Sequence, residues 1–138
     1  MKGRFGGGAG GGDEQITSSF TIFDPGSGEV RERIELPYPN SSGVLATEGG
    51  IVVTALLDGS IIAFDDQTLD VLWRINLGSG MNAPPITYAV NGKQFIAIAS
   101  GACCVRPSGQ IANSKAWIAR TSELRAMSQA TVLYVFGL

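Results

Sequence analysis

Short apolar runs separated by turn residues fill the middle of the chain, over residues 43–77. One run surrounds Val52, a second covers residues 61–64, and a third covers residues 71–75. The Asp58-Gly59 pair lies between the first two runs and suits a type I′ hairpin turn, because both residue types tolerate positive φ. The pattern of short runs and turn residues predicts consecutive antiparallel strands.

The same pattern occurs again 41 residues earlier, where residues 19–36 align with residues 60–77. The seven identical positions in this alignment are Ser19, Phe23, Asp24, Val30, Arg33, Ile34 and Leu36, which match Ser60, Phe64, Asp65, Val71, Arg74, Ile75 and Leu77. An interrupted third copy follows, in which residues 94–99 resemble the strand at Ile51 and residues 132–136 resemble residues 61–64. A period in the forties is typical of four-stranded propeller blades.

The rest of the chain adds one strong turn signal and two weaker expectations. Asn91-Gly92 lies between two apolar runs and predicts a tight hairpin. The helix-compatible sequence after Ser114 favours a short helix near residues 122–126. Residues 1–15 are rich in glycine and predict a flexible segment, whereas residues 16–138 form the predicted incomplete propeller segment.

Charge and hydropathy exclude two classes of partner. The net charge is −2, and the 10 Lys and Arg residues form no basic cluster, so we expect no nucleic-acid surface. No apolar run reaches the roughly 20 residues that cross a bilayer, so we expect no transmembrane segment. The N-terminus lacks the apolar core of a signal peptide. The chain is therefore either cytoplasmic or has a targeting segment that lies outside this sequence.

The absence of histidine limits the chemistry of the chain. Without it there is no Ser–His or Cys–His pair and no histidine-based metal site. The two cysteines, Cys103 and Cys104, are adjacent. Two thiols are favoured over a strained vicinal disulfide, since adjacent cysteines fall outside the usual Cα separations of disulfides. Their redox state stays open.

Residues 63–73 resemble the tryptophan-docking repeat A-x-D-x-x-T-G-x-x-x-W of quinoprotein alcohol dehydrogenases of the methanol and ethanol type. Leu69 stands where the repeat has Gly, and Glu32 stands where the earlier copy would have Trp. The order of the further motifs is similar to the last part of these enzymes; these motifs are residues 43–50, 57–59, 85–88, 91–97 and 130–138. The resemblance implies an all-β fold of about two to three four-stranded antiparallel blades from an eight-bladed propeller.

The same resemblance implies chemistry for the complete family member. Pyrroloquinoline quinone (PQQ) lies on the propeller axis beside Ca²⁺ or a lanthanide, an Asp base removes the alcohol proton, and electrons leave to a cytochrome c. Such proteins are periplasmic. The metal ligands, the Asp base and the disulfide near the quinone belong to earlier blades, so no catalytic or metal-binding residue is assigned to this chain.

Three residues are the candidates for cofactor binding from this segment, at the axial rim of the propeller: Ser41, Asn82 and Val105. Methanol-type enzymes have Trp at the positions of Ser41 and Val105, so the family pattern of close stacking on the cofactor is absent here. Trp73 is interpreted as a packing residue between blades rather than as a ligand contact. Asp58 and Asp65 are interpreted as turn residues rather than as catalytic carboxylates.

Two hypotheses of different classes follow. In the first, the chain is the C-terminal propeller segment of a PQQ-dependent alcohol dehydrogenase and is inactive by itself. In the alternative, it is a non-catalytic propeller that binds partner strands at its blade edges, as outer-membrane assembly scaffolds do. Because terminal blades expose apolar faces and strand edges, we expect the isolated chain to self-associate or to require the remaining blades.

Overall fold

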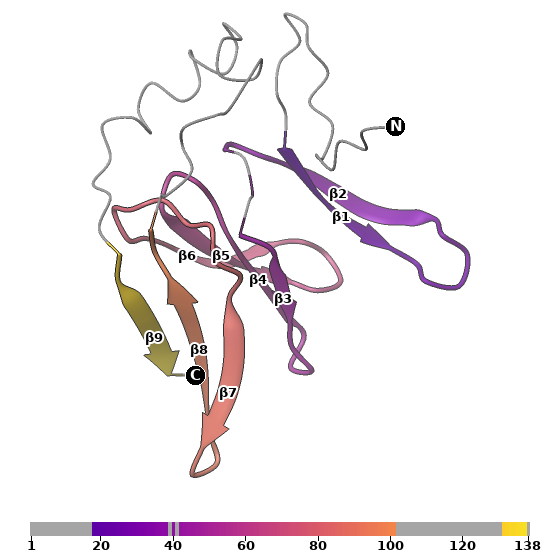
Figure 1. Cartoon of the computed structure of the whole chain (residues 1–138). Coiled ribbons are helices and arrows are strands. Elements are labelled where there is room, and N and C mark those ends of the chain that lie inside the picture. The colour runs from indigo at the N-terminus through magenta and orange to yellow at the C-terminus, as the bar shows by residue number, and fades with distance from the viewer. Residues whose placement is uncertain (1–17, 39, 41, 102–130, 138) are drawn as a thin grey trace, which may run out of the picture.

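The computed structural model describes residues 18–38, 40, 42–101 and 131–137, and these residues form strands and no helix. The predicted all-β class is therefore confirmed for the described part of the chain. The strands, labelled in Figure 1, are β1 (Ser18–Phe23), β2 (Val30–Leu36), β3 (Val44–Ala46), β4 (Ile51–Ala55), β5 (Ser60–Asp65), β6 (Val71–Asn76), β7 (Ile86–Val90), β8 (Lys93–Ala99) and β9 (Leu133–Gly137). Every paired neighbour is antiparallel.

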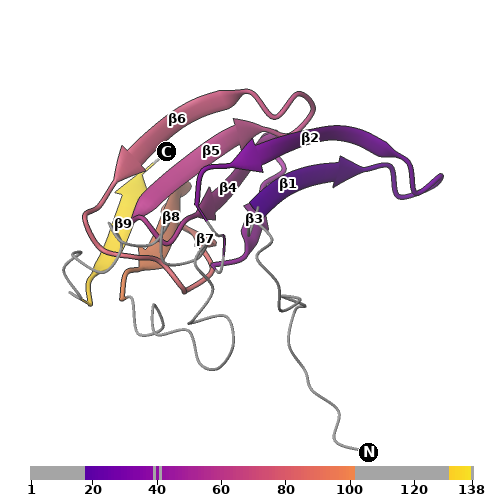
Figure 2. The ribbon, with the colours of Figure 1, turned by 90° about the horizontal axis from the view of Figure 1, so that it is seen from above.

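The described strands form three sheets, which lie side by side in Figures 1 and 2. The first sheet contains β1 and β2, the central sheet has the order β3-β4-β5-β6, and the last sheet has the order β7-β8-β9. Strands that follow one another in the first two sheets are also neighbours in space. The last sheet differs because residues 100–132 separate β8 from β9 in the sequence.

The two middle strands of the central sheet, β4 and β5, are buried on both faces, since a separate apolar cluster lies on each side of the sheet. The cluster toward the last sheet joins central residues such as Val53 and Ile61 to Ile96 and Ile98 of β8. The cluster toward the first sheet joins Leu36, Leu56, Ile62, Phe64 and Leu69.

Alternation along β5 explains this two-sided burial. Ile61 and Ala63 belong to the cluster toward the last sheet, whereas Ile62 and Phe64 belong to the cluster toward the first sheet. All four side chains are buried. Successive side chains of a strand point to opposite faces, so a strand covered on both sides is apolar throughout. The uninterrupted apolar run in the sequence is the consequence of this double coverage.

The two Gly-containing turns, predicted as a type I′ turn at Asp58-Gly59 and as a tight hairpin at Asn91-Gly92, differ in the structure. Asn91 and Gly92 have φ of 50° and 77°, which confirms the tight turn between β7 and β8. The prediction for Asp58 is wrong, because Leu69 and Asn91 are the non-glycine residues with positive φ in the described ranges. Only Gly59, at φ 84°, takes the left-handed conformation there.

The turn between β4 and β5 is a three-residue loop instead. Gly59 N–H donates to Leu56 O at 3.1 Å, and Leu56 N–H donates to Ser60 O at 2.8 Å. This pattern fits a type I turn followed by a left-handed residue that forms a bulge. The Asp58 carboxylate accepts the Ser60 N–H at 3.0 Å, which provides the physical reason for this alternative geometry.

Two expectations from the sequence lie outside the described residues, namely the glycine-rich segment 1–15 and the helix near residues 122–126. In the part of the chain that the structure describes, no helix has the length and apolar character needed to span a bilayer.

Candidate functional site

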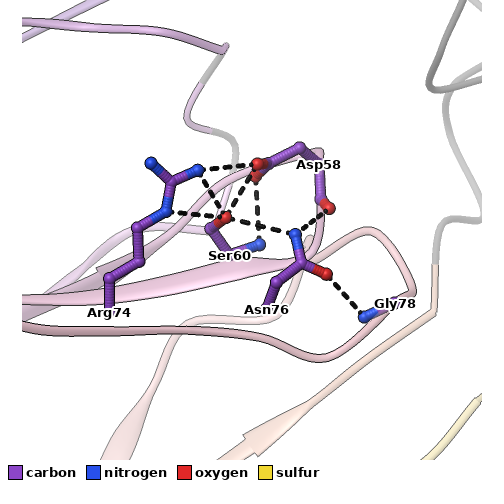
Figure 3. Close-up of polar contacts among 5 residues, drawn as sticks. All are labelled: Asp58, Ser60, Arg74, Asn76 and Gly78. Atoms are coloured by element: carbon purple, nitrogen blue, oxygen red, sulfur yellow. Dashed lines mark hydrogen bonds and ion pairs between the residues drawn. The ribbon is translucent and has the colours of Figure 1, made fainter.

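A compact polar cluster lies at the end of the central sheet where β4 turns into β5 (Figure 3). The Ser60 hydroxyl donates to Asp58 Oδ2 at 2.7 Å, and Arg74 Nη2 donates to the same carboxylate oxygen at 3.0 Å. Arg74 Nε also donates to Ser60 Oγ at 3.1 Å. Asn76 Nδ2 donates to the main-chain oxygen of Asp58 at 2.9 Å, and Gly78 N–H donates to Asn76 Oδ1 at 2.8 Å.

The burial of its central residues indicates that this polar cluster has a structural role. Ser60 is fully buried and Asp58 is 9% exposed. Both Asp58 carboxylate oxygens accept hydrogen bonds, one from the Ser60 main chain and one from the Ser60 hydroxyl and Arg74. A buried carboxylate with these partners is held in place and compensated in charge. The cluster therefore fixes the β4–β5 loop against β6, and the interpretation of Asp58 as a turn residue is confirmed.

Asp24 in the turn between β1 and β2 and Asp65 in the turn between β5 and β6 occupy positions equivalent to each other. Asp65 Oδ1 accepts the Gln67 N–H at 2.9 Å and the Thr68 N–H at 3.0 Å. These two main-chain bonds lower the pKa of Asp65. The Ser27 N–H, the Arg31 side chain and the Gly26 N–H lower the pKa of Asp24 to about 2.

A lowered pKa makes each of these carboxylates a weaker proton acceptor than an ordinary Asp. Asp65 is thus a turn residue, as its sequence context predicted, and the geometry does not favour a role as a general base.

Trp73 lies on β6 and packs into the cluster between the central and last sheets. Its ring centroid is 6.5 Å from that of Phe136 on β9, with an interplanar angle of 39°. The predicted role of Trp73 as a packing residue between neighbouring sheets is confirmed. The tilt shows that it contacts an aromatic partner at an angle rather than lying flat on it.

Of the three candidate rim residues, the structure describes only Asn82. Asn82 is half-buried and follows Met81, which forms an isolated antiparallel bridge with Ser100. Ser41 and Val105 lie outside the described residues, as do Cys103 and Cys104. The rim assignment remains a prediction for all three candidates.

The described residues do not fit a metal ion. Within the described ranges, no three His, Cys, Asp or Glu residues gather as a ligand set. A hard cation such as Ca²⁺ takes six to eight oxygen ligands. The carboxylates of Asp58 and Asp65 accept main-chain hydrogen bonds within their own turns. We therefore derive no metal-dependent step from this part of the chain.

Sequence reasoning missed two members of the polar cluster, Arg74 and Asn76. A signal for them exists, since Ser60 lies opposite Asn76 in the β5–β6 register and Arg74 lies two residues away on the same face. The D-G-S turn followed by R-x-N on the next strand thus encodes the network.

A second polar group missed by sequence reasoning connects β2 to the central sheet. Asn40 Nδ2 donates to Thr54 Oγ1 at 2.7 Å, and the Thr54 hydroxyl donates to Gly43 O at 2.6 Å. The Ser42 hydroxyl donates to Ala55 O at 2.7 Å. Asn40 and Ser42 therefore anchor the link between two sheets.

Comparison with known proteins agrees with this geometry. The sequence model of the family described as "PQQ: Glucose/ethanol/alcohol dehydrogenase, beta-propeller domain" matches residues 22–96. The chain is 38% identical over 88 residues to a quinoprotein ethanol dehydrogenase of Pseudomonas putida, covering 64% of this chain and 14% of the relative. It is 32% identical over 108 residues to the dehydrogenase subunit of an alcohol dehydrogenase (quinone) of Acetobacter aceti, covering 77% of this chain and 15% of that relative.

Among solved structures, a europium-containing methanol dehydrogenase superposes with a TM-score of 0.70 at 29% identity. The superposition covers 87% of this chain and 23% of the methanol dehydrogenase chain. The three stacked sheets thus correspond to part of a longer propeller, and the predicted partial β-propeller fold is confirmed. The chain spans a small part of the length of each relative.

Proposed function

Because this chain belongs to the family of PQQ-type β-propeller domains of glucose, ethanol and alcohol dehydrogenases, we propose that it is the C-terminal propeller segment of a PQQ-dependent alcohol dehydrogenase. The complete protein oxidises primary alcohols, and electrons pass through PQQ to a cytochrome c. The observation that carries the proposal is the agreement between the family match over residues 22–96 and the stacked antiparallel sheets of the same region.

In this proposal the segment supplies packing rather than reacting groups. Trp73 and the two apolar clusters hold consecutive sheets at a fixed separation. Such rigid sheets position the groups of other blades around the propeller axis. When bound, PQQ would accept the electrons of the alcohol and its metal ion would polarise the reacting oxygen, and the metal ligands belong to the remaining blades. Ser41, Asn82 and Val105 stay as the candidates for a contribution at the rim.

The proposal includes a location and a dependence on the rest of the propeller. A periplasmic site fits the quinoprotein names of the relatives. The isolated segment is inactive, because within the described residues no three metal-ligating side chains gather and the carboxylates of Asp58 and Asp65 are held by hydrogen bonds within their turns. Its exposed blade edges favour self-association unless other blades cover them.

A chimera tests this function. The matching 88-residue segment of the Pseudomonas putida quinoprotein ethanol dehydrogenase is replaced by the corresponding part of this chain. With PQQ and Ca²⁺ or a lanthanide supplied, we expect ethanol-dependent reduction of an artificial dye by the chimera and none by the isolated chain. A matched chimera with Trp73→Lys should lose the activity, since a charge would enter the contact between sheets.

A chimera that folds and binds PQQ but never reduces the dye would contradict the proposal. A folded chimera that takes up no quinone, while the isolated chain captures extended peptides, would favour the scaffold alternative instead.

A further inference from the structure

Two turns of this chain contain the same kind of dipeptide, an acidic residue or its amide followed by glycine. Asp58-Gly59 connects β4 to β5, and Asn91-Gly92 connects β7 to β8. In such dipeptides the glycine nitrogen can attack the side-chain carbonyl carbon of the preceding residue and close a five-membered ring. Glycine favours this attack because it has no Cβ to hinder the close approach of the main chain.

The turn at Asp58-Gly59 engages both of the groups that would react. Gly59 N–H donates to Leu56 O at 3.1 Å, so the attacking nitrogen already has a partner. The Asp58 carboxylate accepts hydrogen bonds from Ser60 and Arg74 and is almost completely buried. Groups held in this way react only when the local structure opens, and opening of a buried region is costly.

The turn at Asn91-Gly92 leaves the same two groups unengaged. Among the described residues, neither the Asn91 side chain nor the Gly92 N–H has a hydrogen-bond partner. Both residues are exposed, and a Cβ built on Gly92 would meet no atom within 4 Å. Water therefore reaches the amide carbon, and no neighbouring atom blocks the glycine nitrogen.

The other described asparagines lack this combination of features. The side-chain amides of Asn40 and Asn76 donate hydrogen bonds to groups of β4 and of the loop that follows it. Asn82 is half-buried and precedes Ala83, whose Cβ hinders an attack by the nitrogen of that residue. Exposure, free side-chain atoms and a following glycine coincide at Asn91.

We propose that Asn91 is a site of spontaneous deamidation whose rate is controlled by opening of the β7–β8 hairpin tip. The Gly92 nitrogen forms a bond to Asn91 Cγ and gives its proton to the side-chain amide, while the bond from Cγ to Nδ2 breaks and ammonia leaves. Water then adds to one of the two carbonyl carbons of the succinimide ring and opens it. The products are aspartate, or isoaspartate in which the main chain runs through Cβ and Cγ. Each product carries one additional negative charge, and no electrons are transferred.

The hairpin controls the reaction because the ring cannot close inside the intact turn. Asn91 and Gly92 have φ of 50° and 77°, and a five-membered ring requires a main-chain rotation out of this turn. The tip opens at low cost, since every residue of β7 is exposed and β7 pairs only with β8 among the described strands. Farther along the hairpin, the rings of Tyr88 and Phe95 stack with centroids 5.5 Å apart and limit the opening to the tip.

The isoaspartate product is incompatible with the original turn. It inserts an additional carbon atom into the main chain between Val90 and Lys93, which pair across the hairpin. A two-residue type I′ turn requires two α-linked residues with positive φ. We therefore expect the pairing of β7 with β8 to fray from the tip, whereas the main chain at Ile96 and Ile98, which are buried against the central sheet, stays protected from hydrogen exchange.

Peptide mapping by mass spectrometry tests the site in the full chain, incubated at mildly alkaline pH where amide nitrogens lose their protons more readily. We expect ammonia loss at Asn91 to be at least about tenfold faster than at Asn76, because only the latter requires opening of the sheet. Asn91→Asp is the matched control, since an Asp-Gly pair suits the same turn and has no amide to lose. Tyr88→Ala removes the stacked ring from a partly exposed position and should accelerate ammonia loss at Asn91.

The two glycine turns together test the role of the fold. In concentrated urea we expect isoaspartate at Asp58 and at Asn91, whereas in the folded chain, of these two residues, only Asn91 should form it. Three results would overturn the proposal: ammonia loss at Asn91 no faster than at Asn76, isoaspartate at Asp58 in the folded chain at the rate seen in urea, or a rate at Asn91 that Tyr88→Ala leaves unchanged. The modification is independent of the proposed function, since the assay requires neither quinone nor alcohol.

Discussion

Two hairpins of this chain, β1–β2 and β5–β6, have the same local design but different surroundings. Both turns place an Asp carboxylate under two main-chain N–H groups, at Asp24 and at Asp65. Both hairpins also have a register shift at the same point, just before Phe23 and just before Phe64. Yet Phe23 is 58% exposed, whereas Phe64 is 1% exposed.

This difference shows that the local sequence determines the turn and the bulge, while the neighbouring sheet determines which side chains are buried. The β5–β6 hairpin has a sheet on each side, whereas the β1–β2 hairpin is covered by the central sheet on one side. Substitutions at paired positions of the two hairpins should therefore lower the free energy of unfolding by unequal amounts. Measuring these amounts tests the comparison.

The largest difference is expected for the two phenylalanines. Phe64→Ala removes a fully buried ring that stacks on Phe20 with centroids 5.6 Å apart. We expect it to lower the free energy of unfolding by about 3–5 kcal/mol, the usual cost of such a truncation. Phe23→Ala should stay within about 0.5 kcal/mol of the unmodified chain, as exposed substitutions do. Urea denaturation followed by circular dichroism measures both, and equal costs would refute the comparison.

The next difference concerns the two serines that begin the paired segments. Ser60→Ala leaves Asp58, Arg74 and Asn76 each short of one hydrogen-bond partner. We expect a loss of about 1–3 kcal/mol in unfolding free energy, because unsatisfied buried polar groups are costly.

Ser19→Ala is the matched control, since Ser19 is exposed and should change the unfolding free energy by less than about 0.5 kcal/mol. A double substitution of Ser60 and Arg74 should cost less than the sum of the two single ones, since both belong to one network. Additive costs would show that the hydrogen bonds seen at Ser60 do not act together.

A smaller difference is expected where one hairpin has Gly28 and the other has Leu69. Both residues have positive φ, 74° and 58°, but the Leu69 side chain is buried in the cluster between the first and central sheets. Leu69→Gly removes this buried side chain while relieving a left-handed strain of roughly 1–2 kcal/mol. We expect a net loss of about 1–3 kcal/mol, since the burial term exceeds the strain.

Gly28→Ala isolates the strain at the equivalent position, because a Cβ there would meet no atom within 4 Å. This substitution should lower the free energy of unfolding by about 1 kcal/mol. If Leu69→Gly stabilised the chain in the same denaturation assay, the buried contacts of Leu69 would contribute less than its backbone strain.

These pairs also show what the sequence could and could not establish. Turn chemistry and strand positions follow from short-range signals, so the Asn91-Gly92 hairpin and the run at residues 61–64 were predicted. The exposure of Phe23 and the burial of Phe64 were not predictable, because the local sequence contexts of the two residues are nearly identical. Burial is decided by sheets that pack on the hairpin, and local periodicity does not include them.

The candidate site also divides into features that the local sequence predicts and features that it does not. The resemblance to the docking repeat correctly predicted that Trp73 packs between sheets, since that role is part of the blade itself. The contact of Arg74 with Asp58 joins residues 16 positions apart, and it depends on the three-residue loop that replaced the expected type I′ turn. Because the predicted turn type was wrong, the network was not predicted, although all of its residues are present in the sequence.

The smallest expected effect is the acid dependence of the two shared turns. The folded-state pKa of Asp24 is about 2, below the value near 3.9 of an unfolded Asp. Its stabilising contribution is therefore complete above pH of about 4 and is lost as the pH falls toward 2. Asp24→Asn should flatten the unfolding free energy against pH in this window.

Asp65→Asn should flatten the same region, since main-chain hydrogen bonds lower the pKa of Asp65 as well. Asp24 has an additional ion pair with Arg31, whereas Asp65 accepts the Thr68 hydroxyl. Arg31→Gln should therefore weaken the acid dependence at Asp24 and leave that at Asp65 intact, as denaturation series at several pH values would measure. An equal response of both turns to Arg31→Gln would mean that the shared main-chain contacts do not account for their common behaviour.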